Sequence, residues 1–170
     1  MRNTFVIFII CLMLALQATA QTQSQKTGKE SKAKESKTSK PNDVESIKKL
    51  IETETKAYFG VDYKTWMESW MHTPSAYWSY ADTTGITSFE GWKAIEIGFT
   101  DYFVTSKATD IKVEREWGEI KVYGNGAYAR FKQRVVTNGV PGPVQEEIRV
   151  LEKDKDKWKI LLVGVLKKAT

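Results

Sequence analysis

The chain has 170 residues, of which 41% are hydrophobic and 12% aromatic, and its formal net charge at pH 7 is +5. This length fits one domain with a single core. The charge is unevenly placed, because residues 21–41 carry a net +4 and residues 42–170 carry no net charge. A nucleic-acid-binding domain would hold its positive charge on a folded face, so this distribution argues against nucleic acid as a partner.

The first 20 residues have the pattern of a secretory signal peptide. Arg2 gives a positive start, residues 5–16 are apolar, and Ala18-Thr19-Ala20 is a small-x-small cleavage site. The apolar run of about 12 residues is shorter than the roughly 20 that span a bilayer, so we expect cleavage near Ala20 and no stable membrane insertion afterwards. Cys11 lies inside the apolar run, which disfavours a lipoprotein, and its removal leaves no cysteine. A periplasmic or secreted bacterial protein is the simplest interpretation.

Residues 21–41, QTQSQKTGKESKAKESKTSKP, contain no large apolar side chain. They cannot bury enough surface to offset the entropy of ordering, so we expect a disordered, basic, Lys/Ser-rich linker before a domain at 42–170. The linker is either a solvated spacer or a loose electrostatic attachment to an acidic surface.

Helical spacing predicts helices at the start of the domain. The first runs from a cap at Asn42 or Asp43 to Gly60, and Asp62 caps a short second one. Trp66 and Trp70 share a face of this second helix, because they lie four residues apart. A third helix is predicted to start near Ser88, with an apolar stripe of Trp92, Ile95, Phe99 and Phe103.

After residue 106 the apolar period changes from 3.6 to 2, which indicates strands. Four long antiparallel strands are predicted at 111–122, 127–136, 145–152 and 158–166, and a short hairpin at 76–81 and 86–89. The fold class is therefore α+β, with helices packed on one face of a sheet.

The two faces of the strands are assigned from side-chain size. We expect Ala127, Ala129 and Phe131 to face the helices and Arg130 and Arg134 to point outward. We also expect Gln145, Glu147 and Arg149 to balance this cationic outer face from the neighbouring strand, with Glu147 pairing across the ladder.

Three motifs resemble the NTF2-like superfamily and, within it, the SnoaL-like group with its small exported domains of the DUF4440 type. They are Trp66…Trp70…His72, Gly91-Trp92-Lys93-Ala94-Ile95, and Gly124-Asn125-Gly126-Ala127-Tyr128-Ala129 opening a strand. The likeness covers nearly all of 43–168. It implies an NTF2-like (cystatin-like) cone, with three N-terminal helices on a strongly curved mixed or antiparallel sheet and a pocket at the open end. It also implies a homodimer through the outer sheet face.

Enzymes of this superfamily place an Asp, or an Asp/His or Asp/Arg pair, inside the cone. No such pair is recognisable here, since the one acid near the aromatic segment is Asp82, in a predicted turn. We therefore regard enzymatic activity as undecided and lean against it. We expect no cofactor and no metal, because one histidine and no retained cysteine are too few of the usual zinc ligands.

The candidate site residues are mostly aromatic. His72 is the one side chain that titrates near neutral pH, and it is either a catalytic base or hydrogen-bonded at a helix end. Tyr80 is its candidate partner, donating to a developing oxyanion. Arg115 lies on an apolar strand face, so it either enters the pocket and holds an acidic ligand group or stacks on a tryptophan. The other ligand-binding candidates are Trp66, Trp70, Trp78, Trp92 and Trp117, for which plain core packing is the alternative.

Three functions follow from these candidates. The first is an exported domain that binds a small apolar or aromatic molecule in an aromatic-lined pocket. The second is a SnoaL-like enzyme of the isomerase, dehydratase or cyclase kind, with His72 as its base. The third is a dimeric structural or interaction domain with a filled interior.

Overall fold

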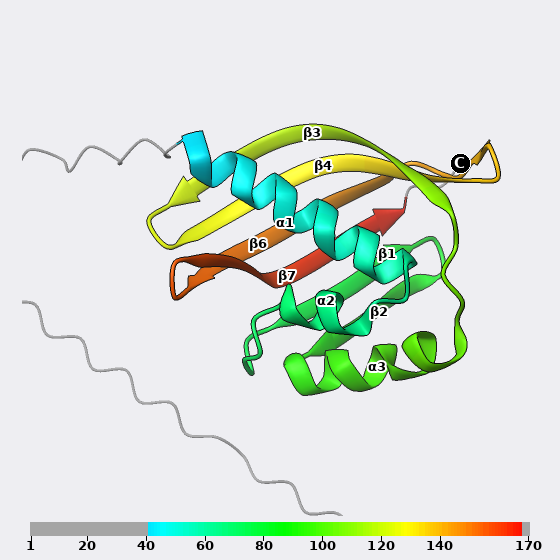
Figure 1. Cartoon of the computed structure of the whole chain (residues 1–170), viewed down its shortest axis with the longest axis horizontal. Coiled ribbons are helices and arrows are strands. Elements are labelled where there is room, and N and C mark those ends of the chain that lie inside the picture. Colours follow the sequence, from blue (N-terminus) through cyan, green and yellow to red (C-terminus); the bar gives the residue numbers. More distant parts are fainter. Residues whose placement is uncertain (1–40, 168–170) are drawn as a thin grey trace, which may run out of the picture. The chain divides into compact units, whose positions relative to one another are not determined.

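The computed structural model describes residues 41–167, which belong to one compact unit (Figure 1). The predicted signal peptide at 1–20 and all of the predicted linker except Pro41 lie outside the described residues. Among the described residues, no helix is long and apolar enough to cross a membrane.

Three helices form where the spacing of apolar residues predicts them. Helix α1 (Pro41–Phe59) ends just before Gly60, and the α2 helix (Tyr63–Glu68) starts after the predicted cap Asp62, whose carboxylate accepts from the Thr65 backbone N–H. Helix α3 (Trp92–Thr105) starts later than the predicted residue 88. The reason is that residues up to Glu90 remain extended and pair with the preceding strand.

The strands form one mixed sheet. Their bounds are β1 (Tyr77–Asp82), β2 (Gly85–Glu90), β3 (Ile111–Tyr123), β4 (Gly126–Thr137), β5 (Val140–Pro141), β6 (Gln145–Asp154) and β7 (Lys157–Lys167). The order across the sheet is β2-β1-β7-β6-β4-β3, with the short β5 added to β4. All neighbours are antiparallel except β1 and β7, which run parallel.

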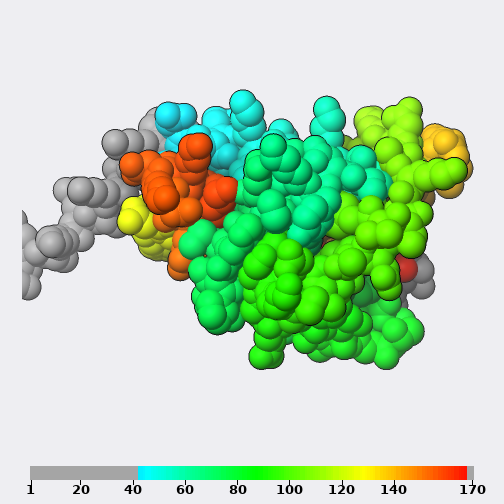
Figure 2. Space-filling view, turned by 60° about the horizontal axis from the view of Figure 1, so that its bottom comes forward, coloured from blue at the N-terminus to red at the C-terminus, as the bar shows by residue number. Residues whose placement is uncertain are grey.

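The helices cover one face of this sheet. In Figure 1, α1 crosses the face made by β3, β4, β6 and β7, while α2 and α3 lie beside β1 and β2. Figure 2 shows the side on which α2 and α3 form the surface. This arrangement confirms the α+β class with N-terminal helices on one sheet face; the strong curvature of the sheet stays a prediction.

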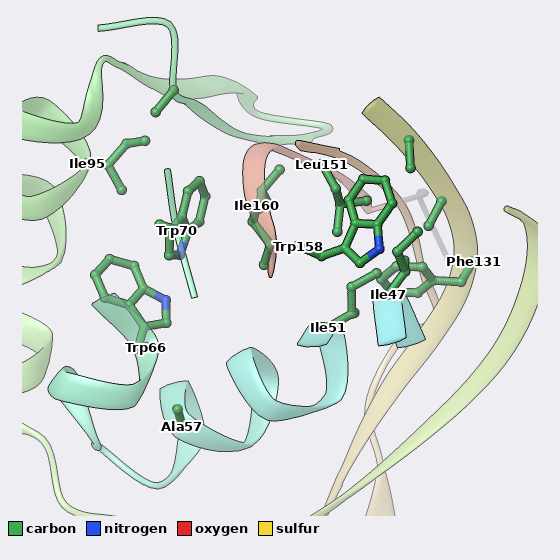
Figure 3. Close-up of a cluster of buried hydrophobic side chains, with 14 residues drawn as sticks. Ile47, Ile51, Ala57, Trp66, Trp70, Ile95, Phe131, Leu151, Trp158 and Ile160 are labelled. Carbon is green, nitrogen blue, oxygen red and sulfur yellow. The ribbon is translucent and has the colours of Figure 1, made fainter. Parts of the chain in front are cut away.

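A continuous apolar core lies between the two layers. Ile47 and Ile51 of α1 pack against Leu151 and Ile160 of the sheet, and Trp66 of α2 extends the core toward α3 (Figure 3). All five side chains are at most 1% exposed. The chain has a single cysteine, Cys11, so it cannot form an internal disulfide. Burial of these apolar side chains is therefore the main source of stability.

The face of β6 is opposite to the predicted one. Glu147 and Arg149 point to the inner face and are buried, while Ile148 is on the outer face and 39% exposed. The outer arginines are instead balanced by acids of β3, because Arg134 Nη2 lies 2.6 Å from Glu114 Oε2. As predicted, Ala127, Ala129 and Phe131 face the helices. Two charged residues of β6, Glu147 and Arg149, therefore lie in the interior rather than on the outer face.

Candidate functional site

A cavity of about 280 Å³ lies between the second half of α1 and the inner face of the sheet. Its wall also includes residues from α2 and α3 and from β1, β4, β6 and β7. These seven elements extend from α1 to β7 in the sequence, so the cavity exists only in the complete fold.

One side of the cavity is aromatic. Trp66 and Trp78 both pack against Phe99 of α3, with ring centroids 5.2 Å and 5.0 Å apart, and the Trp78–Phe99 pair meets edge to face. Tyr58 of α1 meets Phe99 in the same manner, and Tyr80 of β1 brings a further ring and a hydroxyl. Such a wall suits a flat apolar ligand.

The other side holds a buried cluster of polar side chains. Glu54 of α1, Gln133 of β4 and Glu147 and Arg149 of β6 are each at most 6% exposed. Arg149 Nη2 lies 2.6 Å from Glu147 Oε2 and 3.7 Å from Glu54 Oε2. Gln133 Nε2 donates to Glu147 Oε1. Paired opposite charges are what make such burial tolerable.

This cluster has unused hydrogen-bonding capacity. Among residues 41–167, Glu147 Oε2 and Arg149 Nε have no hydrogen-bond partner. The 2.6 Å contact between Glu147 and Arg149 is therefore an ion pair without an aligned hydrogen bond. Because a buried polar atom without a partner costs about 1–3 kcal/mol, such atoms in a native interior mark a strained or functional place.

The cluster also shifts the protonation of Glu54. Burial raises the pKa of the Glu54 carboxyl, and the nearby Glu147 raises it further, whereas Arg149, a hydrogen bond from Trp66 and the more distant Arg115 oppose the shift. Since burial is the largest cause, the neutral carboxyl is favoured beyond the usual range of a glutamic acid. A neutral carboxyl in a cavity can donate as well as accept a hydrogen bond.

Arg115 stands next to this cluster rather than in the cavity wall. Its guanidinium lies over the rings of Trp117 and Phe131, at 5.1 Å and 4.8 Å from their centroids. It donates to Gln133 Oε1 at 2.6 Å and to Thr55 Oγ1 at 3.0 Å. The predicted stacking on a tryptophan is present; Arg115 also lines the groove between α1 and β3, and its role in holding an acidic ligand group stays a prediction.

The tryptophan candidates lie in three different places. Trp66 and Trp78 line the cavity, while Trp117 lines a separate groove between α1 and β3. Trp70 is 2% exposed and packs against Trp66 and Trp92, so it belongs to the core.

The structure does not bring His72 and Tyr80 together. Tyr80 lines the cavity, whereas His72 is exposed and stacks on Trp92 at 4.2 Å. His72 Nε2 donates to the carbonyl of Met67 at 2.9 Å, near the end of α2. This is the helix-end arrangement that the sequence offered as the alternative to a catalytic base.

No residue set typical of a bound metal accompanies the cluster. Within the described part of the chain, no group of three or more His, Cys, Asp or Glu side chains is placed to hold a metal ion. The chemistry on offer at the cavity is that of carboxyl, amide, guanidinium and hydroxyl groups.

Comparison with known proteins identifies the fold. No family model and no curated protein matches the chain. It is similar to the solved structure of an NTF2-like protein of unknown function from Shewanella oneidensis, with TM-score 0.58 and 16% identity over 74% of this chain and 99% of that one. An NTF2-like protein with a cystatin-like fold from Novosphingobium aromaticivorans gives TM-score 0.57 and 19% identity, over 74% and 82%.

A third similar structure is a putative calcium/calmodulin-dependent protein kinase type II association domain from Thiobacillus denitrificans, with TM-score 0.57 and 13% identity over 71% of this chain and 93% of that one. These likenesses show that residues 41–167 of the present chain have an NTF2-like fold. At such identities the likeness shows the fold alone.

In this NTF2-like fold the sequence carried a signal for the polar cluster. Glu54 lies three residues after Ile51 and seven after Ile47, on the buried stripe of α1. Glu147 and Arg149 alternate with Ile148, so the strand pattern alone gives no preference for either face. The position of Leu151, two residues beyond Arg149 and fully buried, decides the face.

Proposed function

We propose that this domain binds a small, planar, mostly apolar molecule with one polar end in the cavity between α1 and the sheet. The observation that carries the proposal is a buried polar cluster, two of whose atoms lack a hydrogen-bond partner among the described residues, in the wall of the same cavity as a set of aromatic rings. Aromatic side chains supply contact area, and the few polar groups at one end fix the orientation.

The cavity volume limits the size of the ligand. A volume of about 280 Å³ lies just under the roughly 300 Å³ at which ligand pockets usually begin. This favours a molecule of one or two rings. We place Trp66, Trp78 and Phe99 against the ring and Glu54, Gln133 and Arg149 at the polar end.

Binding of indole, phenol and benzamide, followed by NMR chemical shifts, tests this function. We expect Trp78→Leu, in the cavity wall, to weaken binding of the best probe by at least about tenfold, since it removes the largest aromatic contact of β1. Trp92→Leu is the matched control, because Trp92 is also half-buried but lies outside the cavity wall, and we expect its affinity to stay near that of the wild type. Equal effects of both variants, or no binding of any probe, would favour a structural domain with a filled interior.

A SnoaL-like enzyme is the second candidate, and Glu54 is the observation that favours it. A buried carboxyl beside Arg149 in a ligand-sized cavity suits a general acid or base. His72 is less well placed for that role, because it is exposed and engaged with the Met67 carbonyl. Deuterium exchange from solvent into a panel of small enolisable ketones tests this candidate: exchange that depends on Glu54, and vanishes in Glu54→Gln, would favour the enzyme over the binding domain.

We also propose that the protein is exported, to the periplasm or beyond, after cleavage near Ala20. The support is the N-terminal sequence pattern described above. Amino-terminal sequencing of the protein recovered from the periplasm should begin at or near Gln21, and a start at Met1 would contradict export with cleavage.

Self-association through the outer sheet face is the third part of the proposal. A groove of about 520 Å³ crosses that face over β1, β7, β6, β4 and β3, with Ile148 and Leu166 exposed in it. Beside these apolar residues the face carries the acids Glu116 and Glu119 and the base Arg130. A surface with both charges around an apolar centre is suited to pair with a second copy of itself.

A further inference from the structure

Three charged groups at the polar end of the cavity, and a fourth just behind them, decide by their charges what can enter. Glu54, Glu147 and Arg149 line it, and Arg115 joins them through Thr55 and Gln133. With both carboxyls ionised, the four charges sum to zero, and an entering anion would meet two like charges. With one carboxyl protonated, the set carries one positive charge, which matches one ligand carboxylate.

Glu54 is the carboxyl whose anion the geometry stabilises less. Arg149 lies closer to Glu147, at 2.6 Å, than to Glu54, at 3.7 Å. Glu147 also accepts a hydrogen bond from Gln133. The ionised form of Glu147 is therefore better stabilised than that of Glu54.

Three elements, α1, β3 and β6, contribute the titratable or charged groups around Glu54, while α2 contributes the neutral Trp66. These groups are Glu147 and Arg149 of β6, Arg115 of β3 and Tyr58 of α1 itself. Burial and Glu147 raise the pKa of Glu54 more than Arg149 and Arg115 lower it. Tyr58 adds no charge in the neutral range, because burial raises the pKa of its phenol to about 12.

Arg149 has donors to spare for a second carboxylate. A guanidinium offers five N–H groups, and the contacts of Arg149 with the two glutamates both involve Nη2. Its Nε has no acceptor within residues 41–167, and its central carbon lies 5.8 Å from the centroid of the Phe131 ring. A protonated Glu54 adds an O–H donor on the same side of the cavity.

We propose that the cavity takes up the carboxylate of a small aromatic acid together with one proton, which Glu54 carries, while Arg149 provides the matching positive charge. The aromatic wall holds the ring, and the carboxylate replaces the missing acceptor of the buried cluster. This inference rests on the proposed function, because it assigns a ligand class to the same cavity.

Isothermal titration of the full-length protein with benzoate and with benzamide tests the inference. The two probes have the same ring and nearly the same shape, but only benzoate is charged. We expect benzoate to bind, and its affinity to fall by about tenfold per pH unit once Glu54 ionises in the free protein. Benzamide affinity should change by less than about threefold over the same range. Benzamide is uncharged, so its binding requires no accompanying proton.

Glu54→Gln distinguishes the effect of the proton on Glu54 from the effect of the cavity's shape. Gln has the shape of a protonated Glu, so this variant should still bind benzoate and should lose the pH dependence. Glu45→Gln, exposed on the same helix, is the matched control and should keep the wild-type profile. If Glu54→Gln does not fold, the wild type alone can be used. Its binding enthalpy, measured in buffers of different ionisation enthalpy, gives the number of protons taken up on binding. We expect about one proton per benzoate in the pH range where affinity falls.

Three results would overturn the inference. Binding of benzamide without binding of benzoate at any pH would reject the carboxylate and leave the proposed function standing. Benzoate binding that does not vary with pH, or that varies equally in Glu54→Gln, would reject the proton on Glu54. Binding of neither probe, nor of indole or phenol, would reject the proposed function as well.

Discussion

Glu54 occupies a place on α1 where the neighbouring turns of the helix present Ile47, Ile51 and Ala57 to the core. A carboxylate there loses its hydration, and Arg149, at 3.7 Å, compensates only in part. A buried acid at such a position lowers the stability of the domain, so its presence fits a role in binding better than a role in packing.

The pH dependence of stability should reveal this cost. Because burial raises the pKa of Glu54 in the folded state, its favourable contribution is complete below the unfolded pKa, about 4.3, and is lost as the pH rises through the folded pKa. We therefore expect Glu54→Gln to gain stability relative to the wild type as the pH rises from about 5 to about 8. Urea unfolding at several pH values measures the difference.

Glu45→Gln is the control for this experiment. Glu45 is exposed and pairs with Lys48 at 3.0 Å, so its replacement should change the free energy of unfolding by less than about 1 kcal/mol at every pH. A difference between wild type and Glu54→Gln that stays constant with pH would contradict a buried, titrating Glu54.

At this scale the sequence predicted the aromatic residues better than the charged ones. Trp66, Trp78 and Tyr80 line the cavity, in keeping with the tendency of large aromatic side chains toward burial, and their binding of a ligand stays a prediction. Glu54, Glu147 and Arg149 could not be identified with comparable ease, because a charged residue is expected at the surface unless its partner is known. Glu54 of α1 and its partner Arg149 of β6 lie about 95 residues apart in sequence.

At the level of elements, α3 packs closely on β2 through a glycine. A Cβ added to Gly98 would lie 2.5 Å from the nearest atom of the Phe89 ring. The ring itself is held between Trp78, at 5.5 Å, and Phe99, at 5.9 Å between centroids. The glycine thus brings α3 near enough for Phe99 to form part of the cavity wall.

We expect Gly98→Ala to destabilise the domain despite the better helix propensity of alanine. The propensity gain of about 1 kcal/mol is outweighed by overpacking against Phe89, which typically costs 1–3 kcal/mol. Thermal unfolding measures the net change. Thr100→Ala, exposed on the same helix, is the comparison, and it should leave the melting temperature unchanged or slightly higher; a stabilised Gly98→Ala would show that the ring moves away freely.

Periodicity predicted the number, kind and order of the helices and long strands, since each has a regular apolar repeat. It failed at two places for the same physical reason. The start of α3 and the inner face of β6 depend on pairing with another strand, β1 in the first case and β4 in the second, and local spacing does not report such pairing.

At the scale of the whole molecule, the outer sheet face lacks a covering layer within residues 41–167. Ile148 and Leu166 are 39% and 47% exposed on adjacent strands, in the groove that crosses this face. Exposed apolar residues gathered in one place indicate an interaction site. This is the basis for the proposed homodimer.

Sedimentation equilibrium of the wild type and of Ile148→Glu tests the dimer. We expect the wild type to sediment as a dimer and Ile148→Glu as a monomer, because a charge at the centre of the interface must be desolvated without a partner. Val140→Glu, on the exposed short strand β5, should remain dimeric. A monomeric wild type, or a dimeric Ile148→Glu, would contradict association through this face.

The parallel pairing of β1 with β7 also governs the sequence of events in which the domain can form. Tyr77 of β1 is paired with Leu162 of β7, so the earliest strand of the chain finds its long partner only in the last one. Until β7 has left the ribosome, β1 has no long strand to pair with, and the part of the cavity wall that β7 contributes is missing. The β1–β2 hairpin can therefore join the sheet only after β7 has been made, and such late closure would be compatible with the proposed export.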